Sequence, residues 1–168
     1  MSSNSVLNIK TTVTEVKTGI KKNDRQKLAM GLSSVLADTY ILYLKTQGVH
    51  WNVVGPVFYG LHKMTEEQYN DLAIAIDDIA ERIRALGHPA PASFVQFIEL
   101  CTLQEGHVSE TVEGMLSDLV SDNEQISKSI RAITQIAEEM DDVFTADLLT
   151  SRIGVHEKAA WMLRSSAS

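Results

Sequence analysis

A long helical pattern that begins directly after a Gly-Pro pair is the strongest constraint on the fold of this chain. The pattern runs unbroken from Val57 to Leu86, and Gly55 and Pro56 mark a turn that separates it from a preceding helix. Apolar side chains recur along one flank of this segment, at Leu61, Leu72, Ile76, Ile79 and Ile83. Few stretches alternate between apolar and polar residues as strands do, so the sequence predicts an all-α protein.

Three further long helices and one short helix are predicted from the rest of the sequence. They cover residues 24–51, 93–103, 109–140 and 142–164, and the second of these is the short one. Asn23 or Asp24 is expected to cap the first. The long connection between the second and third long helices predicts a four-helix bundle with one crossover that carries the short helix. With 168 residues and 44% hydrophobic content, we expect one domain over residues 23–168, preceded by a tail over residues 1–22 that is either flexible or docked.

Potential metal ligands lie on both sides of the Gly-Pro turn. His50 ends the helix before the turn. Four more candidates share a single stripe of the next helix, at roughly 0°, 40°, 60° and 100° around its axis: His62, Glu66, Asp77 and Glu81. A charged stripe is often only the solvated face of a helix. Here the two histidines, and the position of the stripe beside the apolar flank, favour a metal site.

The two halves of this stripe are too far apart to bind one ion within a single chain. At 1.5 Å rise per residue, Glu66 lies about 16 Å from Asp77, whereas metal–ligand bonds are about 2 Å long. The halves meet only if a second copy of the helix runs antiparallel, with a twofold axis near Asp71 and Leu72. Such a dimer would contain two equivalent sites, each built from both chains. Two small side chains near the crossing would let the helices approach: Ala73 and Ala75.

The residues around these ligands form a pattern shared with a known family. The pattern comprises His50-Trp51-Asn52, Gly55, Phe58, Leu61-His62, Glu66-Glu67, Asp77 and Ala80-Glu81-Arg82, and later Thr145-Ala146-Asp147-Leu148-Leu149, His156-Glu157-Lys158 and Trp161-Met162-Leu163. From about Asp24 onward, the chain resembles the Dps mini-ferritins, the DNA-protection-during-starvation family. The resemblance implies a ferritin-like four-helix bundle that assembles as a hollow homo-oligomeric shell, a dodecamer.

The same resemblance implies which residues bind iron. In Dps proteins the positions matching His50, His62 and Glu66 bind iron from one subunit, and those matching Asp77 and Glu81 bind it from the twofold-related subunit. Family members carry either Asp or Glu at the position of Glu66. The chain contains no Glu-x-x-His pair, the spacing with which larger ferritins build a di-iron centre inside one bundle. Iron chemistry is therefore expected between subunits, without an organic cofactor.

The activity implied by the resemblance is that of a cytoplasmic ferroxidase. It would oxidise Fe(II), with hydrogen peroxide preferred over dioxygen, and store the Fe(III) inside the shell. Imidazole and carboxylate ligands suit iron and leave coordination positions open for an oxidant. Trp51, beside His50, would supply or accept an electron, or else pack at the dimer interface. Two alternatives stay open: a nucleoid DNA-coating protein with secondary iron chemistry, and a helical interaction module without metal.

Charge gives two opposing indications about nucleic acid. The net charge of -7 fits a protein that handles cations, and it would repel DNA at long range. Residues 1–22 nevertheless have a net charge of +3, because they contain one glutamate and four lysines. The lysines are Lys10, Lys17, Lys21 and Lys22. By resemblance, such a tail is a candidate for phosphate contacts. Apolar residues at helical spacing favour instead a segment that docks on the bundle: Ile9, Val13, Val16 and Ile20.

Acidic residues crowd the turn before the last helix. They are Glu138, Glu139, Asp141, Asp142 and Asp147. One interpretation is a solvated turn in which Asp142 caps the following helix. The resemblance offers another, because in Dps shells this turn surrounds threefold pores. Glu138, Asp142 and Asp147 would then concentrate Fe(II) at the pore.

The remaining sequence features indicate no further site. Cys101 is the single cysteine, which excludes an intramolecular disulfide, and we expect it to be a buried apolar residue. The first thirty residues show no signal-peptide pattern, and the uncharged stretches are too short to cross a membrane. Three histidines lack a partner at ligand spacing and are expected to be structural or surface residues: His88, His107 and His156.

Overall fold

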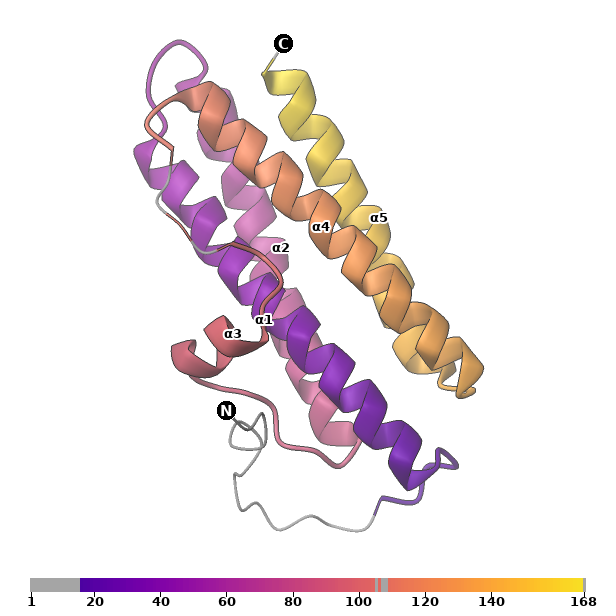
Figure 1. The fold of residues 1–168 in the computed structure, drawn as a ribbon. Coiled ribbons are helices and arrows are strands. Elements are labelled where there is room, and N and C mark those ends of the chain that lie inside the picture. Colours follow the sequence, from indigo (N-terminus) through magenta and orange to yellow (C-terminus); the bar gives the residue numbers. More distant parts are fainter. Residues whose placement is uncertain (1–15, 105, 107–108, 168) are drawn as a thin grey trace.

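The chain forms an all-α bundle of four long helices (Figure 1). The connection between the second and the third of them is a long crossover. The structure is a computed structural model, and it describes residues 16–104, 106 and 109–167. Its helices are α1 (Lys22–Asn52), α2 (Phe58–Ala85), the short α3 (Phe94–Leu100), α4 (Val112–Glu139) and α5 (Val143–Ser166). The predicted fold class and the short helix in the crossover are confirmed. No helix in the described part of the chain is long and apolar enough to cross a membrane.

Several predicted helix ends differ from the structure; α4, for example, begins at Val112 and not at 109. The expected cap at Asn23 or Asp24 is wrong, because Lys21 is the N-cap residue and its carbonyl accepts the first helical bond, from Arg25 N at 3.0 Å. Asp24 lies within the first turn, where its charge complements the helix dipole. The short helix ends at Leu100 and not at 103. Its expected start is close, since Ser93 caps it.

The core lies between two helical hairpins, α1–α2 and α4–α5, which meet chiefly through α1 and α4. Its largest fully buried side chains are Leu28, Leu32, Leu36, Leu42, Ile79, Ile83, Leu86, Leu116, Leu119, Ile126, Ile130 and Leu149. A side chain at Gly31 would place Cβ 2.7 Å from Cδ1 of Ile133, so this glycine permits the close approach of α1 to α4. The apolar flank predicted for α2 is confirmed, because Leu61, Leu72, Ile79 and Ile83 are buried.

A buried carboxylate fastens the crossover to α1. Asp38 accepts hydrogen bonds from Thr102 N at 2.5 Å, Thr102 Oγ1 at 2.9 Å and Leu103 N at 3.2 Å. Burial raises the pKa of Asp38 more than these hydrogen bonds lower it. The adjacent Cys101 is half-buried rather than buried, and its Sγ lies 3.5 Å from the carbonyl oxygens of both Ile98 and Leu103.

The described part of the N-terminal segment packs against the bundle. Val16 lies against the turn after α2, where its Cγ2 would be 2.9 Å from a Cβ placed on Gly87. Ile20 packs on the hydrophobic core, and its carbonyl accepts a hydrogen bond from Arg25 Nη1 at 2.5 Å. These contacts favour docking for residues 16–20. Lys10, Ile9 and Val13 lie outside the described residues.

Candidate metal centre

The two histidines predicted on either side of the Gly-Pro turn are brought face to face. His50 is near the C-terminal end of α1 and His62 is in the first turns of α2. Their rings stack with centroids 3.7 Å apart and planes inclined by 17°. His50 Nδ1 lies 2.8 Å from the carbonyl oxygen of His62, and His62 Nδ1 lies 2.9 Å from the carbonyl oxygen of His50. Each histidine is thus held by the backbone of the other.

These reciprocal contacts determine which ring nitrogens can bind a metal. A carbonyl oxygen only accepts hydrogen bonds, so Nδ1 of each ring must carry the hydrogen. In the neutral imidazole, Nε2 then keeps its lone pair, which is the electron pair that a metal ion requires. A hydrogen bond from the other ring nitrogen to a carbonyl is also the usual support of a metal-binding histidine. The pair therefore fits a metal ion.

The turn between the helices sets the register of the two histidines. Gly55 adopts φ +92°, a conformation that favours glycine, and its carbonyl accepts a hydrogen bond from Phe58 N at 3.1 Å. This turn folds α2 back along α1 so that His62 faces His50. The ring of Phe58 stacks on His62 at 5.0 Å. Tyr69 and His50 form a T-shaped pair, with ring centroids 5.2 Å apart.

Phe58 and Tyr69 were not predicted as part of this site. Tyr69 follows His62 by seven residues, which is two helical turns, so helical spacing alone could have placed it on the same face. Phe58 belongs to the quoted sequence pattern, but nothing in its spacing indicated contact with an imidazole. Both rings pack against the histidine pair and limit the directions from which an ion can approach.

Glu66 lies one turn after His62 and is half-exposed. Its Oε2 accepts a hydrogen bond from Lys63 Nζ at 2.7 Å. This hydrogen bond is the main cause that lowers the pKa of Glu66, followed by the charge of Lys63 and weaker effects of the histidines. The carboxylate is therefore ionised at neutral pH. Because an exposed ion pair contributes little free energy, Glu66 can exchange Lys63 for a metal ion at small cost.

Asp77 and Glu81 lie farther along α2, and both are exposed. Among the residues that the structure describes, no three His, Cys, Asp or Glu side chains of one chain are grouped to hold a metal ion. The structure thus brings His50 and His62 together, but within one chain it groups neither Glu66, nor Asp77 and Glu81, with them into a set of three. The expected role of Ala75 at a helix crossing is wrong, because this residue is buried in its own bundle, and only Ala73 faces outward.

An exposed apolar surface lies next to the histidine pair. Trp51 is 63% exposed, and its neighbours across the turn are exposed as well: Val54, Val57, Phe58 and Tyr59. Farther along α2, Ile74 is 66% exposed, between the two halves of the ligand stripe. Exposed apolar side chains that are grouped in this way are typical of a surface that contacts another protein. A second subunit is a suitable occupant, because it would also complete the ligand set.

Both carboxylate oxygens of Asp142, in the acidic turn, are hydrogen-bonded within the fold. Arg82 Nη2 donates to both carboxylate oxygens of Asp142 at 2.7 Å, and Thr145 N donates to Asp142 Oδ1 at 3.1 Å. Burial raises the pKa of Asp142, but the hydrogen bonds from Arg82 and Thr145 together outweigh it and lower the pKa. The predicted helix cap is thus confirmed. Glu138 and Asp147 are exposed.

Two of the remaining histidines are held inside the fold. His156 is almost fully buried, with Nδ1 2.9 Å from Asn123 Oδ1. Burial, and then the charge of Arg152, lower the pKa of His156 to about 3, so the ring is neutral. His88 is half-buried, and burial lowers its pKa. Neither lies with the histidine pair, and His107 is outside the described residues.

Comparisons with known proteins agree with the fold. The model of the ferritin-like domain matches residues 30–167. The chain is 39% identical over 134 residues to DNA protection during starvation protein 2 of Bacillus anthracis, covering 80% of this chain and 92% of the relative. It is 41% identical over 153 residues to an uncharacterised low temperature-induced protein of Nostoc, and the match covers 89% of this chain and 85% of that protein. The crystal structure of a Dps protein from Vibrio cholerae superposes with a TM-score of 0.85 at 31% identity, covering 92% of this chain and 98% of that one.

Proposed function

Because the chain belongs to the Dps family of ferritin-like proteins, we propose that it oxidises Fe(II) with hydrogen peroxide and stores the Fe(III) inside a shell of twelve subunits. The observation that carries this proposal is the histidine pair, in which His50 and His62 each direct Nδ1–H to a carbonyl and keep Nε2 for a metal. The Vibrio cholerae relative is described as a member of the ferritin-like diiron-carboxylate proteins. Iron is therefore the substrate that we assign to the site.

The proposed site is shared between two subunits. One subunit supplies His50, His62 and Glu66, and the partner subunit's Asp77 and Glu81 complete it. The stacked pair of His50 and His62 and the exposed apolar surface around Trp51 support this arrangement. A twofold axis would create two such sites in each dimer.

The chemistry requires charge neutralisation and a path for electrons and protons. Two Fe(II) ions give two electrons to one peroxide, the O–O bond breaks, and two protons complete two waters. Three carboxylates beside two neutral imidazoles offset much of the charge of the iron substrate and favour Fe(III) as the product. Trp51 is exposed beside the site, where it would pass an electron or pack against the partner subunit.

An anaerobic titration tests this function directly. The assembled protein is titrated with Fe(II) under argon, and one hydrogen peroxide is then added for every two Fe(II). We expect saturable binding of Fe(II) and rapid oxidation without release of hydroxyl radical, which a spin trap would detect. Oxidation no faster than in buffer would exclude a ferroxidase and leave the interaction module without metal.

The exposed acids of the turn before α5 are proposed to line a route for Fe(II) into the shell. Glu138 and Asp147 are both exposed and would attract cations at a threefold contact. Asp142 was part of the expected set, but its charge is already neutralised by Arg82 within the fold. It would therefore hold the turn in place and contribute little to the field.

DNA protection would follow from removal of Fe(II) and peroxide, the reactants that generate hydroxyl radical. Direct coating of DNA is the alternative, and it depends on four lysines: Lys10, Lys17, Lys21 and Lys22. Two observations oppose a free arm, since Val16 and Ile20 pack on the bundle. Lysines in a docked segment can still contact phosphates, so the charge itself has to be tested.

Replacing all four lysines with glutamine is expected to abolish retardation of duplex DNA, if the tail binds DNA at all, while iron oxidation stays unchanged. Each phosphate contact contributes about -0.9 to the slope of log affinity against log salt, and the subunits of a shell multiply weak contacts. Replacement with arginine is the matched control, because it keeps the charge. If the original protein gives no retardation at low salt, or if the glutamine variant binds equally well, the DNA-coating alternative is excluded. The tail is then only a docked segment.

A further inference from the structure

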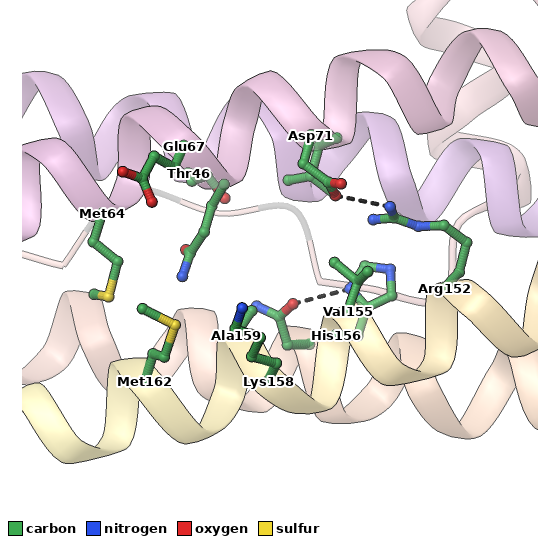
Figure 2. Close-up of a pocket in the computed structure, with 13 residues that line it drawn as sticks. Thr46, Met64, Glu67, Asp71, Arg152, Val155, His156, Lys158, Ala159 and Met162 are labelled. Carbon is green, nitrogen blue, oxygen red and sulfur yellow. Dashed lines mark hydrogen bonds and ion pairs between the residues drawn. The ribbon is translucent and has the colours of Figure 1, made fainter.

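A cavity of about 230 Å³ lies between α2 and α5, and none of the five candidate iron ligands lines it. These two helices meet along only a short stretch, which leaves the space open. Figure 2 shows Asp71, Arg152 and His156 together at one end of the lining, and the sulphurs of Met64 and Met162 toward the other end, where the Glu67 carboxylate lies at the edge. Such a lining suits a ligand with one polar end and one apolar end.

Arg152 brings an unused pair of donors to the polar end. Its side chain is buried, and Nη1 donates to Asp71 Oδ2 at 2.7 Å. Nε and Nη2 are buried and have no hydrogen-bond partner. These two nitrogens form one edge of the guanidinium, the fork that binds a carboxylate through two parallel hydrogen bonds. Burying these two donors without an acceptor costs free energy, so a ligand that accepts hydrogen bonds from this edge would be stabilised.

His156 brings an unused acceptor to the same end. Asn123 Nδ2 donates to the carbonyl of Leu119 at 2.8 Å, which leaves Asn123 Oδ1 to accept from His156 Nδ1 at 2.9 Å. His156 Nε2 therefore carries a lone pair, and it is buried without a partner. The low pKa of His156 keeps this nitrogen unprotonated at neutral pH. It can accept a hydrogen bond from a hydroxyl group.

The lining also limits which ligands are suitable. A metal ion is disfavoured, because the positive charge of Arg152 lies beside His156 and no three metal-binding side chains group here within the described residues. Glu67 and Asp71 also line the cavity and offset the charges of Arg152 and Lys158, so the lining has no net positive charge to hold a dianion such as phosphate. Its volume is below the range of about 300 to 1,000 Å³ typical of drug-sized ligands. The remaining class is a small monoanion with a hydroxyl group and an apolar body.

We propose that this cavity binds a small 2-hydroxy carboxylic acid, with its carboxylate on the free edge of Arg152 and its hydroxyl donating to His156 Nε2. The apolar body would extend toward Met64 and Met162 (Figure 2). This assignment does not depend on iron oxidation. Binding would fill the space between α2 and α5, and so tie the two hairpins together.

Calorimetric titration of the metal-free, assembled protein with mandelate tests the proposal, with phenylacetate as the same acid without its hydroxyl. We expect one mandelate per subunit and at least about fivefold weaker binding of phenylacetate, as the loss of one hydrogen bond predicts. Arg152→Gln should weaken both acids by more than about tenfold, because the charged fork is lost. His156→Phe should remove only the preference for mandelate.

A variant at the rim guards against loss of folding in the buried variants. Val155→Trp fills the cavity without changing either buried polar side chain, and it should abolish binding of both acids. Ser151→Trp, on the same helix but outside the lining, should bind as the original protein does. The proposal is overturned if mandelate shows no saturable binding, which would mean that only water fills the cavity. It is also overturned if both acids bind equally well or if Val155→Trp still binds mandelate.

Discussion

Removal of both histidines, in His50→Ala with His62→Ala, is expected to slow peroxide-driven oxidation of Fe(II) more than about 100-fold while the shell still assembles. Loss of a single supporting contact at a metal site already costs about 10- to 100-fold, and here two nitrogen ligands disappear. The carboxylates remain, so weak and unspecific Fe(II) binding should persist. The measurement is the initial rate of Fe(III) formation after peroxide is added to anaerobically loaded protein, with assembly followed by gel filtration.

Asparagine at both positions separates the chemistry from the fold. Its amide nitrogen can replace Nδ1–H as the donor to the opposite carbonyl, but asparagine has nothing in place of the Nε2 lone pair. The double asparagine variant should therefore be as inactive as the alanine variant and closer to the original protein in thermal stability. His88→Ala is the control for removal of a histidine outside the site. An unchanged oxidation rate in both double variants would exclude the histidine pair as the iron site.

Helical periodicity predicted the bundle well because α2 and α4 each place an apolar flank against one core. The failure at Asn23 and Asp24 has a physical cause. Sequence shows which side chains can cap a helix, but the helix begins at Lys22, where Ile20 docks on the core and its carbonyl accepts a hydrogen bond from Arg25. A tertiary contact thus replaced the cap. The role of Asp142 was ambiguous for a similar reason, since its partner Arg82 is sixty residues away.

The common helix face of His62, Glu66, Asp77 and Glu81 follows from helix geometry alone, and their binding of iron stays a prediction. The mutual hydrogen bonds of His50 and His62 could not be predicted, since they require the exact register that the turn at Gly55 imposes on two helices. The cavity beside Arg152 was hidden for another reason. Sequence does not show which polar atoms stay without a partner, because that depends on every neighbour across the bundle.

Subunits that are inactive alone are expected to regain activity when they assemble together. One variant carries His50→Ala with His62→Ala, and the other carries Asp77→Asn with Glu81→Gln. In a mixed dimer, one of the two sites takes its histidines from the second variant and its carboxylates from the first, so that site is intact, while the other site has lost both sets. Random assembly makes half of the dimers mixed, which should restore about a quarter of the sites of the original protein.

The measurement is the peroxide-driven oxidation rate after the two variants are unfolded together, mixed in equal amounts and refolded. The same variants refolded separately and mixed afterwards are the control, and they should stay inactive because their dimers do not exchange subunits during the assay. A tag on one variant shows by pull-down that mixed shells have formed. If mixed shells form but remain inactive, all ligands must come from one chain and the intersubunit site is wrong. Recovery near a quarter would instead require that the partner subunit's Asp77 and Glu81 bind iron opposite His50 and His62, because no other pairing leaves a complete set.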